Sequence, residues 1–337
     1  MSSTGNQPRA GGGDQQDESL LTVLLALAAN VGVGVLKLGA GLISGSAALL
    51  SEAAHSAGDC TTEVLLLIAQ RRSRKPADRR HPFGYGKERY FWSMLASMAI
   101  LVSGAGFSIY EGTSTVIGGS ENGRWYWINY PVLAVAAALE GLSLRQAALQ
   151  MRRETRRTRR SLRAYLRTPR DPTVNSVLLE DSAAIAGLTI AAVGVGLRQL
   201  TGNPVWDGLA SIAIGLLLLV VAIVLARACQ ALLVGQQADP RLIEQIVQVL
   251  ESQDEVVDVV DVLTMMTGAD SVLLCTRVDF VDSFSAADLE LACVRIDNEL
   301  RERFPMLTEV FTQPASRDDR ELRGRVARRY GHSLADE

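Results

Sequence analysis

Histidine, cysteine and aromatic residues are scarce in this chain, and each scarcity excludes a class of protein. The 337 residues include three histidines and four cysteines, and aromatic residues make up only 5%. The cysteines form no CxxC pair, so their spacing indicates neither a zinc ribbon nor a redox motif. Four cysteines spread over so long a sequence also exclude a small disulfide-stabilised domain. We expect them to behave as buried apolar side chains.

Apolar residues, by contrast, are abundant. They make up 48% of the chain, and the mean hydropathy is +0.14. This composition excludes disorder for most of the chain and favours an integral membrane protein with a soluble appendage. Residues 1–19 are rich in Gly, Gln, Ser and Asp. We interpret them as a disordered tail rather than a signal peptide, because no basic start leads into a short apolar core.

Six windows are long and apolar enough for membrane helices, which need about 20 residues to cross a hydrocarbon core of about 30 Å. They are residues 20–43, 47–70, 90–116, 125–147, 173–200 and 204–233. The connections after the second and fourth windows are basic: residues 71–89 hold eight lysines and arginines, and residues 145–170 hold ten arginines. The positive-inside rule therefore predicts that both termini are cytoplasmic. The membrane is expected to be the cell membrane if the source is prokaryotic.

The composition changes after residue 235, where no long apolar run remains. Helical spacing at 240–250 and 286–304 and strand-like alternation at 256–265, 271–281 and 307–312 predict the order αββαβ. The fold class we expect is a mostly α membrane protein with six transmembrane helices, followed by a small ferredoxin-like α+β domain. The predicted organisation is a tail at 1–19, a membrane domain at 20–235, a cytoplasmic domain at 236–316 and a charged, frayed tail at 317–337.

The second window carries ionisable residues well inside its apolar length. Glu52, His55 and Asp59 stand at i, i+3 and i+7, so they share one face of a helix. His55 and Asp59 are one turn apart, the spacing at which one helix supplies two ligands to a divalent ion. Imidazole nitrogen with carboxylate oxygen suits zinc, and it can also hold manganese, iron or cobalt. The alternative is a purely structural hydrogen-bond cluster, but charges inside lipid are costly and commonly functional.

The fifth window contains Glu180 and Asp181. We expect Asp181 to be a direct metal ligand, and Glu180 to be either a further ligand or a proton acceptor that supports the ligands. The alternative is a salt bridge from these carboxylates to Lys37 in the first window.

Other polar residues are weaker candidates. His81 and Asp78 lie in a basic loop and could hold a second metal, but the neighbouring proline and glycines equally indicate a tight turn. Asp207 lies near a predicted helix end, where a single polar residue more often pairs than binds substrate. We attribute the arginine-rich segment to orientation and to contact with anionic lipid headgroups, and we do not expect a nucleic-acid partner.

The motifs SGSAALLSEAAHSAGD and PADRRHPFGYGKER, together with the layout of the whole chain from about residue 20 to 315, resemble the cation diffusion facilitator family of divalent metal transporters. The GYGKERYFW run and the LLED of the fifth window are most similar to the branch of the mitochondrial zinc transporter 9. The resemblance implies membrane metal ligands at His55 and Asp59 and a second pair in the fifth window. Aligning the family's aspartate on Asp181 places Val177 where the family has histidine, which leaves Glu180 as the substitute ligand.

The resemblance further implies transport rather than enzymatic activity. Zinc, or alternatively manganese, iron or cobalt, would be exchanged for protons by alternating access, with export from the cytoplasm as the expected direction. It also implies a homodimer, in which the soluble domain serves as a dimerisation module, and no organic cofactor. The competing hypotheses are a membrane-embedded metal-dependent hydrolase, disfavoured because no HExxH motif is present, and a metal-sensing scaffold.

Overall fold

The computed structural model describes residues 12–119, 125–157 and 172–330. They fall into two compact units. The helical unit comprises the described residues of Met1–Leu67, Met94–Arg160 and Thr173–Ala226, and the sheet unit comprises those of Ile68–Ser93, Ser161–Pro172 and Arg227–Glu337. The division passes through three helices rather than falling at residue 235, because Tyr90 and Leu232, near helix ends, are buried in the same apolar core as the sheet.

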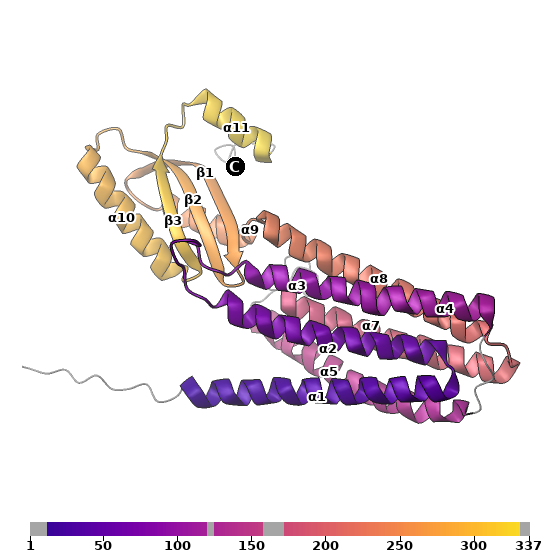
Figure 1. The fold of residues 1–337 in the computed structure, drawn as a ribbon. Helices are drawn as coiled ribbons and strands as arrows, with labels where there is room; N and C mark the ends of the chain where they lie inside the picture. Colours follow the sequence, from indigo (N-terminus) through magenta and orange to yellow (C-terminus); the bar gives the residue numbers. More distant parts are fainter. Residues whose placement is uncertain (1–11, 120–124, 158–171, 331–337) are drawn as a thin grey trace, which may run out of the picture. The chain divides into compact units, whose positions relative to one another are not determined.

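Long helices build the helical unit (Figure 1). They are α1 (Gly12–Ser44), α2 (Ala47–Ser73), α3 (Glu88–Ala99), α4 (Phe107–Gly118), α5 (Asn129–Arg157), α7 (Pro172–Thr201) and α8 (Val205–Val234). The π-helical segment η1 (Ile100–Gly106) joins α3 directly to α4, and the short 3₁₀ turn η2 (Tyr126–Ile128) leads into α5. The ends of α2, α3 and α8 continue into the sheet unit.

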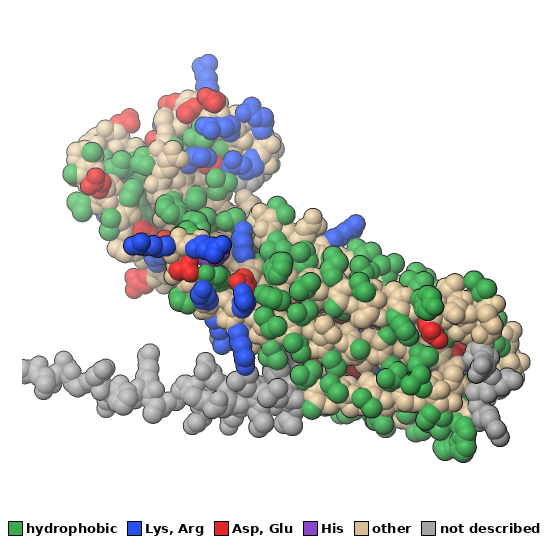
Figure 2. Space-filling model, viewed as in Figure 1, with side chains coloured by type: hydrophobic (Ala, Val, Ile, Leu, Met, Phe, Trp, Pro, Cys, Tyr) green, Lys and Arg blue, Asp and Glu red, His purple; other side chains and the backbone are tan. Residues whose placement is uncertain are grey.

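By length and composition, five helices among the described residues could cross a membrane: Leu27–Ser44, Glu88–Gly118, Tyr126–Arg153, Leu178–Thr201 and Val205–Val234. The remaining predicted span, the second window, corresponds to α2, which is 27 residues long but carries Glu52, Asp59 and Glu63 within its apolar length. Figure 2 shows hydrophobic side chains over the visible face of the helical unit. Large apolar side chains such as Ile117 and Leu200 are more than 80% exposed, which is the surface expected of helices solvated by lipid.

The sheet unit contains α9 (Pro240–Glu251), β1 (Val256–Gly268), β2 (Ser271–Phe280), α10 (Ala286–Arg303), β3 (Leu307–Pro314) and α11 (Arg320–Tyr330). The predicted αββαβ order is confirmed. The sheet has the order β1-β2-β3, with β1 and β2 antiparallel and β2 and β3 parallel. Ser285 caps α10 in a reciprocal arrangement with Asp288, and this hydrogen bonding lowers the pKa of Asp288.

Two segments at the chain ends differ from the prediction. Helix α11 occupies residues for which a frayed tail was expected. It is stabilised because Leu322 and Val326, one turn apart, are buried against Val260 of β1. At the other end, α1 begins at Gly12, within the stretch expected to be disordered. Residues 12–19 contain no proline, so a nucleated helix can extend through them. Residues 1–11 lie outside the described residues, as do residues 158–170 of the arginine-rich segment 145–170 that was assigned to lipid contact.

Candidate metal site in the helical unit

The polar residues of α2 form one continuous stripe. Glu52, His55, Asp59 and Glu63 recur every three or four residues, so they lie along one face of the helix. Glu52 and His55 are buried, and the Asp59 side chain is 18% exposed. His55 Nδ1 lies 3.5 Å from Asp59 Oδ1. The two residues predicted to act as ligands from this helix therefore adjoin each other inside the unit.

Helix α7 runs antiparallel to α2 and brings its carboxylates to the level of Asp59. Two observations establish this direction. A Cβ at Gly187 would lie 2.4 Å from Glu52 Oε1, whereas Arg198, later on α7, donates from Nη1 to the carbonyl of Gly45, which precedes α2, at 2.9 Å. Asp59 lies seven residues beyond Glu52, so its level on α7 is about seven residues before Gly187. That is the position of Glu180 and Asp181, and both interact electrostatically with Asp59.

Helix α5 supports this arrangement from the side. The Ser143 hydroxyl donates to Asp181 Oδ2 at 2.8 Å, which orients the carboxylate. Among the described residues, no group of three or more His, Cys, Asp or Glu side chains is arranged to hold a metal as it stands. The predicted ligands thus share one interior region, and coordination requires them to close further around an ion.

Several buried polar atoms of the stripe lack a hydrogen-bond partner among the described residues. They are both ring nitrogens of His55, Oδ1 of Asp59, Oε1 of Glu52 and Oε2 of Glu63. Leaving such a group buried and unpaired costs about 1–3 kcal/mol, so folded proteins rarely tolerate several together. Carboxylate oxygens and an imidazole nitrogen are the donors that a divalent cation requires. The donor set therefore fits a metal ion.

Lys37 does not pair with the α7 carboxylates, so the predicted alternative is wrong. Its ammonium group donates instead to Glu52 Oε2 at 3.1 Å and to Ser56 Oγ at 2.9 Å, both on α2. Lys37 and Glu52 are fully buried. Consequently no ammonium group neutralises Glu180 or Asp181 by a direct ion pair within the described residues.

Two further carboxylates adjoin the site. Glu63 accepts a hydrogen bond from Asn30 of α1 at 2.5 Å, and Glu140 of α5 interacts electrostatically with Asp59 and Asp181. Glu63 had a signal in the sequence, since it stands one turn after Asp59. Glu140 is a single charge in an apolar segment, and only the packing of α5 beside the other helices shows that it faces the stripe.

The loop residues His81 and Asp78 belong to a tight turn. Asp78 Oδ1 accepts the backbone N–H groups of Arg80 at 2.9 Å and of His81 at 2.8 Å, and Oδ2 accepts the Tyr85 hydroxyl at 2.8 Å. The Tyr85 hydrogen bond is the main cause that lowers the Asp78 pKa to about 2. The two side chains are about half exposed. The hydrogen bonding favours the turn interpretation over a second metal site.

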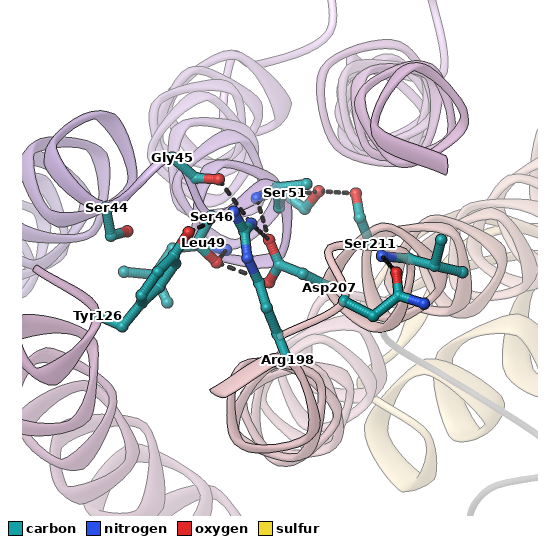
Figure 3. A network of polar contacts seen from close by, with 12 residues as sticks. Ser44, Gly45, Ser46, Leu49, Ser51, Tyr126, Arg198, Asp207 and Ser211 are labelled. Atoms are coloured by element: carbon teal, nitrogen blue, oxygen red, sulfur yellow. Dashed lines mark hydrogen bonds and ion pairs between the residues drawn. The ribbon is translucent and has the colours of Figure 1, made fainter. Parts of the chain in front are cut away.

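Asp207 belongs to a separate buried network at the start of α2 (Figure 3). Its carboxylate accepts the Ser46 hydroxyl at 2.8 Å, the backbone N–H of Ala47 at 2.6 Å and Arg198 Nη1 at 3.1 Å. Arg198 also donates to the Tyr126 hydroxyl. Ser46 in turn accepts the N–H of Leu49 at 3.3 Å, as an N-cap does. Asp207 therefore caps α2 from a distant helix, in contact with neither His55 nor Asp59.

Comparison with known proteins shows which family this chain matches. The family model of the cation efflux transmembrane domain matches residues 23–234. The mitochondrial proton-coupled zinc antiporter SLC30A9 of Homo sapiens is 34% identical over 239 residues, covering 71% of this chain and 42% of the antiporter. Metal tolerance protein C4 of Arabidopsis thaliana is 31% identical over 274 residues, covering 79% and 58%. The magnetosome protein MamB of Magnetospira sp. is 29% identical over 188 residues, covering 56% and 58%. The chain spans less than half the length of the antiporter.

Proposed function

Because this chain belongs to the cation efflux family, we propose that it is a divalent metal transporter that exchanges Zn²⁺ for protons. The family is one of transporters, not enzymes, and the chain is an integral multi-pass membrane protein. One observation carries the proposal: buried, unpartnered donor atoms of His55 and Asp59 lie at the level of Asp181 and Glu180. Zinc is the proposed substrate because these residues include a nitrogen donor and because the relative is named a zinc antiporter.

The exchange follows from the chemistry of the donor atoms. A metal ion binds neutral imidazole and ionised carboxylates, so protons and metal compete for the same atoms of His55, Asp59 and Asp181. When the ion leaves, the carboxylates of Asp59, Glu180 and Asp181 repel one another in a medium of low dielectric constant. Binding protons relieves that repulsion. Since one divalent ion and two protons carry equal charge, either can neutralise a pair of carboxylates.

The remaining assignments complete the proposal. His55, Asp59 and Asp181 hold the ion, and Glu180 either completes the site or accepts its protons. Alternating access exposes this site first to one side of the membrane and then to the other. Export from the cytoplasm, cytoplasmic termini and a homodimeric assembly are proposed from the family resemblance and from the distribution of basic residues.

Metal flux into proteoliposomes tests the proposal. Zinc, manganese, iron and cobalt uptake is measured together with internal pH for the parent and for His55→Ala, Asp59→Ala, Asp181→Ala and Glu180→Gln. Ser182→Ala is the matched control, because its exposed hydroxyl donates to the backbone carbonyl of Leu178 in its own helix. We expect zinc uptake with opposite proton movement in the parent and the control, and its loss in the first three variants.

Two results would contradict the proposal. Zinc binding without flux in the parent would favour the metal-sensing scaffold. Full flux in Asp181→Ala would show that the α7 assignment is wrong and that Glu180 or another group holds the ion.

A further inference from the structure

A buried ion pair lies one helical turn from His55. The ammonium group of Lys37 donates to Glu52 Oε2 at 3.1 Å and to Ser56 Oγ at 2.9 Å. Both side chains of the pair are 0% exposed, so neither charge is solvated by water. Lys37 thus donates to residues that precede and follow His55 on α2. Among the described residues it forms no hydrogen bond with the His55 imidazole.

The surrounding helices hold this pair in a narrow space. On α1, Gly34 and Gly41 share the face of Lys37, and a Cβ at these positions would meet Ser56 at 3.3 Å and Leu50 at 2.9 Å. On the other side, Gly187 of α7 lets the backbone approach Glu52 Oε1. Close approach of the backbones therefore fixes where Lys37 and Glu52 can meet.

One carboxylate oxygen of Glu52 accepts a hydrogen bond, and the other accepts none among the described residues. Oε2 is bound by Lys37, whereas Oε1 is buried and unpartnered within the described residues. Glu52 is on the same face of α2 as His55, three residues away, and it interacts electrostatically with both His55 and Asp59. Released from Lys37, this carboxylate would be a further oxygen donor within reach of an ion at His55.

We propose that Lys37 is a positioning residue that holds Glu52 out of the metal coordination sphere and thereby favours Zn²⁺ over Mn²⁺. The inference rests on the proposed transport function and deepens it. Zinc sites are mostly four-coordinate with nitrogen or sulfur donors, whereas harder ions such as Mn²⁺ favour more oxygen donors. Keeping the carboxylate of Glu52 on Lys37 limits the oxygen count around the ion.

The test is metal selectivity in a set of variants of the full chain. Parent, Lys37→Met, Glu52→Gln and the double variant Lys37→Met/Glu52→Gln are purified, and Zn²⁺ and Mn²⁺ affinities are measured in competition. Lys37→Gln, which keeps a hydrogen-bond donor for Glu52 without its charge, provides a milder variant should Lys37→Met not fold. Breaking the other buried pair with Arg198→Met/Asp207→Asn is the matched control, because it loosens the same unit away from His55.

We expect the ratio of Mn²⁺ to Zn²⁺ affinity to rise about tenfold or more in Lys37→Met, as loss of groups that orient metal ligands commonly changes affinity by about 10–100-fold. The double variant should return the ratio to that of the parent, because the released carboxylate is gone. The d–d absorption of bound Co²⁺ should weaken in Lys37→Met, as coordination rises above four, and recover in the double variant. The control should keep the parental ratio and spectrum.

Three results would overturn the inference. An unchanged ratio in Lys37→Met and Lys37→Gln would make the ion pair purely structural. A change that persists in the double variant would exclude Glu52 as its cause, and loss of zinc binding in Glu52→Gln would make Glu52 itself a ligand. Failure of the parent to bind any of these metals would instead contradict the proposed function, so the two failures are distinguishable.

Discussion

The helical unit contains two buried polar clusters, and they differ in how well their atoms are satisfied by hydrogen bonds. In the cluster of Asp207, Arg198 and Ser46, the carboxylate accepts three hydrogen bonds and the guanidinium has several partners. In the cluster of His55 and Asp59, several metal-binding atoms are buried without hydrogen-bond partners among the described residues. A buried charge by itself therefore does not indicate function. An unsatisfied set of metal-binding atoms is the more specific sign.

The largest effect on stability is expected when the satisfied cluster is broken. Asp207→Ala leaves the Arg198 guanidinium buried without its carboxylate and removes the cap of α2. We expect the free energy of unfolding to fall by about 3–5 kcal/mol. Denaturation of the protein in detergent micelles, followed by circular dichroism, measures the change. The double variant Arg198→Met/Asp207→Ala should recover part of the loss, and equal losses in both would mean that the capping contacts dominate.

A smaller loss is expected where α7 packs against the Glu52 side chain of α2. Gly187→Ala would place a methyl group 2.4 Å from Glu52 Oε1. Overpacking of this kind costs about 1–3 kcal/mol. Gly141→Ala in α5 is the matched control, because a Cβ there meets nothing within 4 Å. The same denaturation experiment should show a loss only for Gly187→Ala, and equal behaviour of the two variants would contradict the close approach of α7 to Glu52.

A substitution in the cluster of His55 and Asp59 should instead increase the stability of the metal-free protein. Asp59→Asn removes a buried charge that interacts with the carboxylates of Glu180 and Asp181. We expect metal-free Asp59→Asn to be more stable than the metal-free parent by about 0.5–2 kcal/mol, a typical gain when a functional site is neutralised. Thermal unfolding in the presence of a chelator measures it. A lower stability of Asp59→Asn would contradict this prediction and would show that the Asp59 carboxylate stabilises the fold.

The smallest effect concerns the loop after α2, outside the membrane-spanning segments. Folding lowers the Asp78 pKa from 3.8 to about 2. The carboxylate therefore stabilises the turn above the pKa of the unfolded chain, and this contribution is lost as pH falls towards 2. The side-chain carbon signal of Asp78 in isotopically labelled protein should titrate near pH 2 in the parent and nearer 4 in Tyr85→Phe. Equal midpoints would contradict the role of the Tyr85 hydroxyl.

Much of the fold could be predicted because its determinants are local. Residue spacing along α2 placed Glu52, His55 and Asp59 on one face, and the cap at Ser285 marked the start of α10. Helix α11 was missed because its composition is highly charged, and only the contact of Leu322 and Val326 with Val260 stabilises it. The pairing of Lys37 with Glu52 was also missed, because both α2 and α7 offered carboxylates and only helix packing decides between them.

The cap on α2 has a consequence for the order of assembly during synthesis. The backbone N–H of Ala47 donates to the Asp207 carboxylate, which lies 160 residues later in the chain. At ribosomal rates of about 5–20 residues per second, that partner arrives roughly 10–30 seconds after Ala47 itself. Until then, the first turn of the helix that carries His55 and Asp59 lacks this cap. This contact, unlike the local cap from Ser46, can therefore form only after α8 has been made, when nearly the whole membrane domain is present.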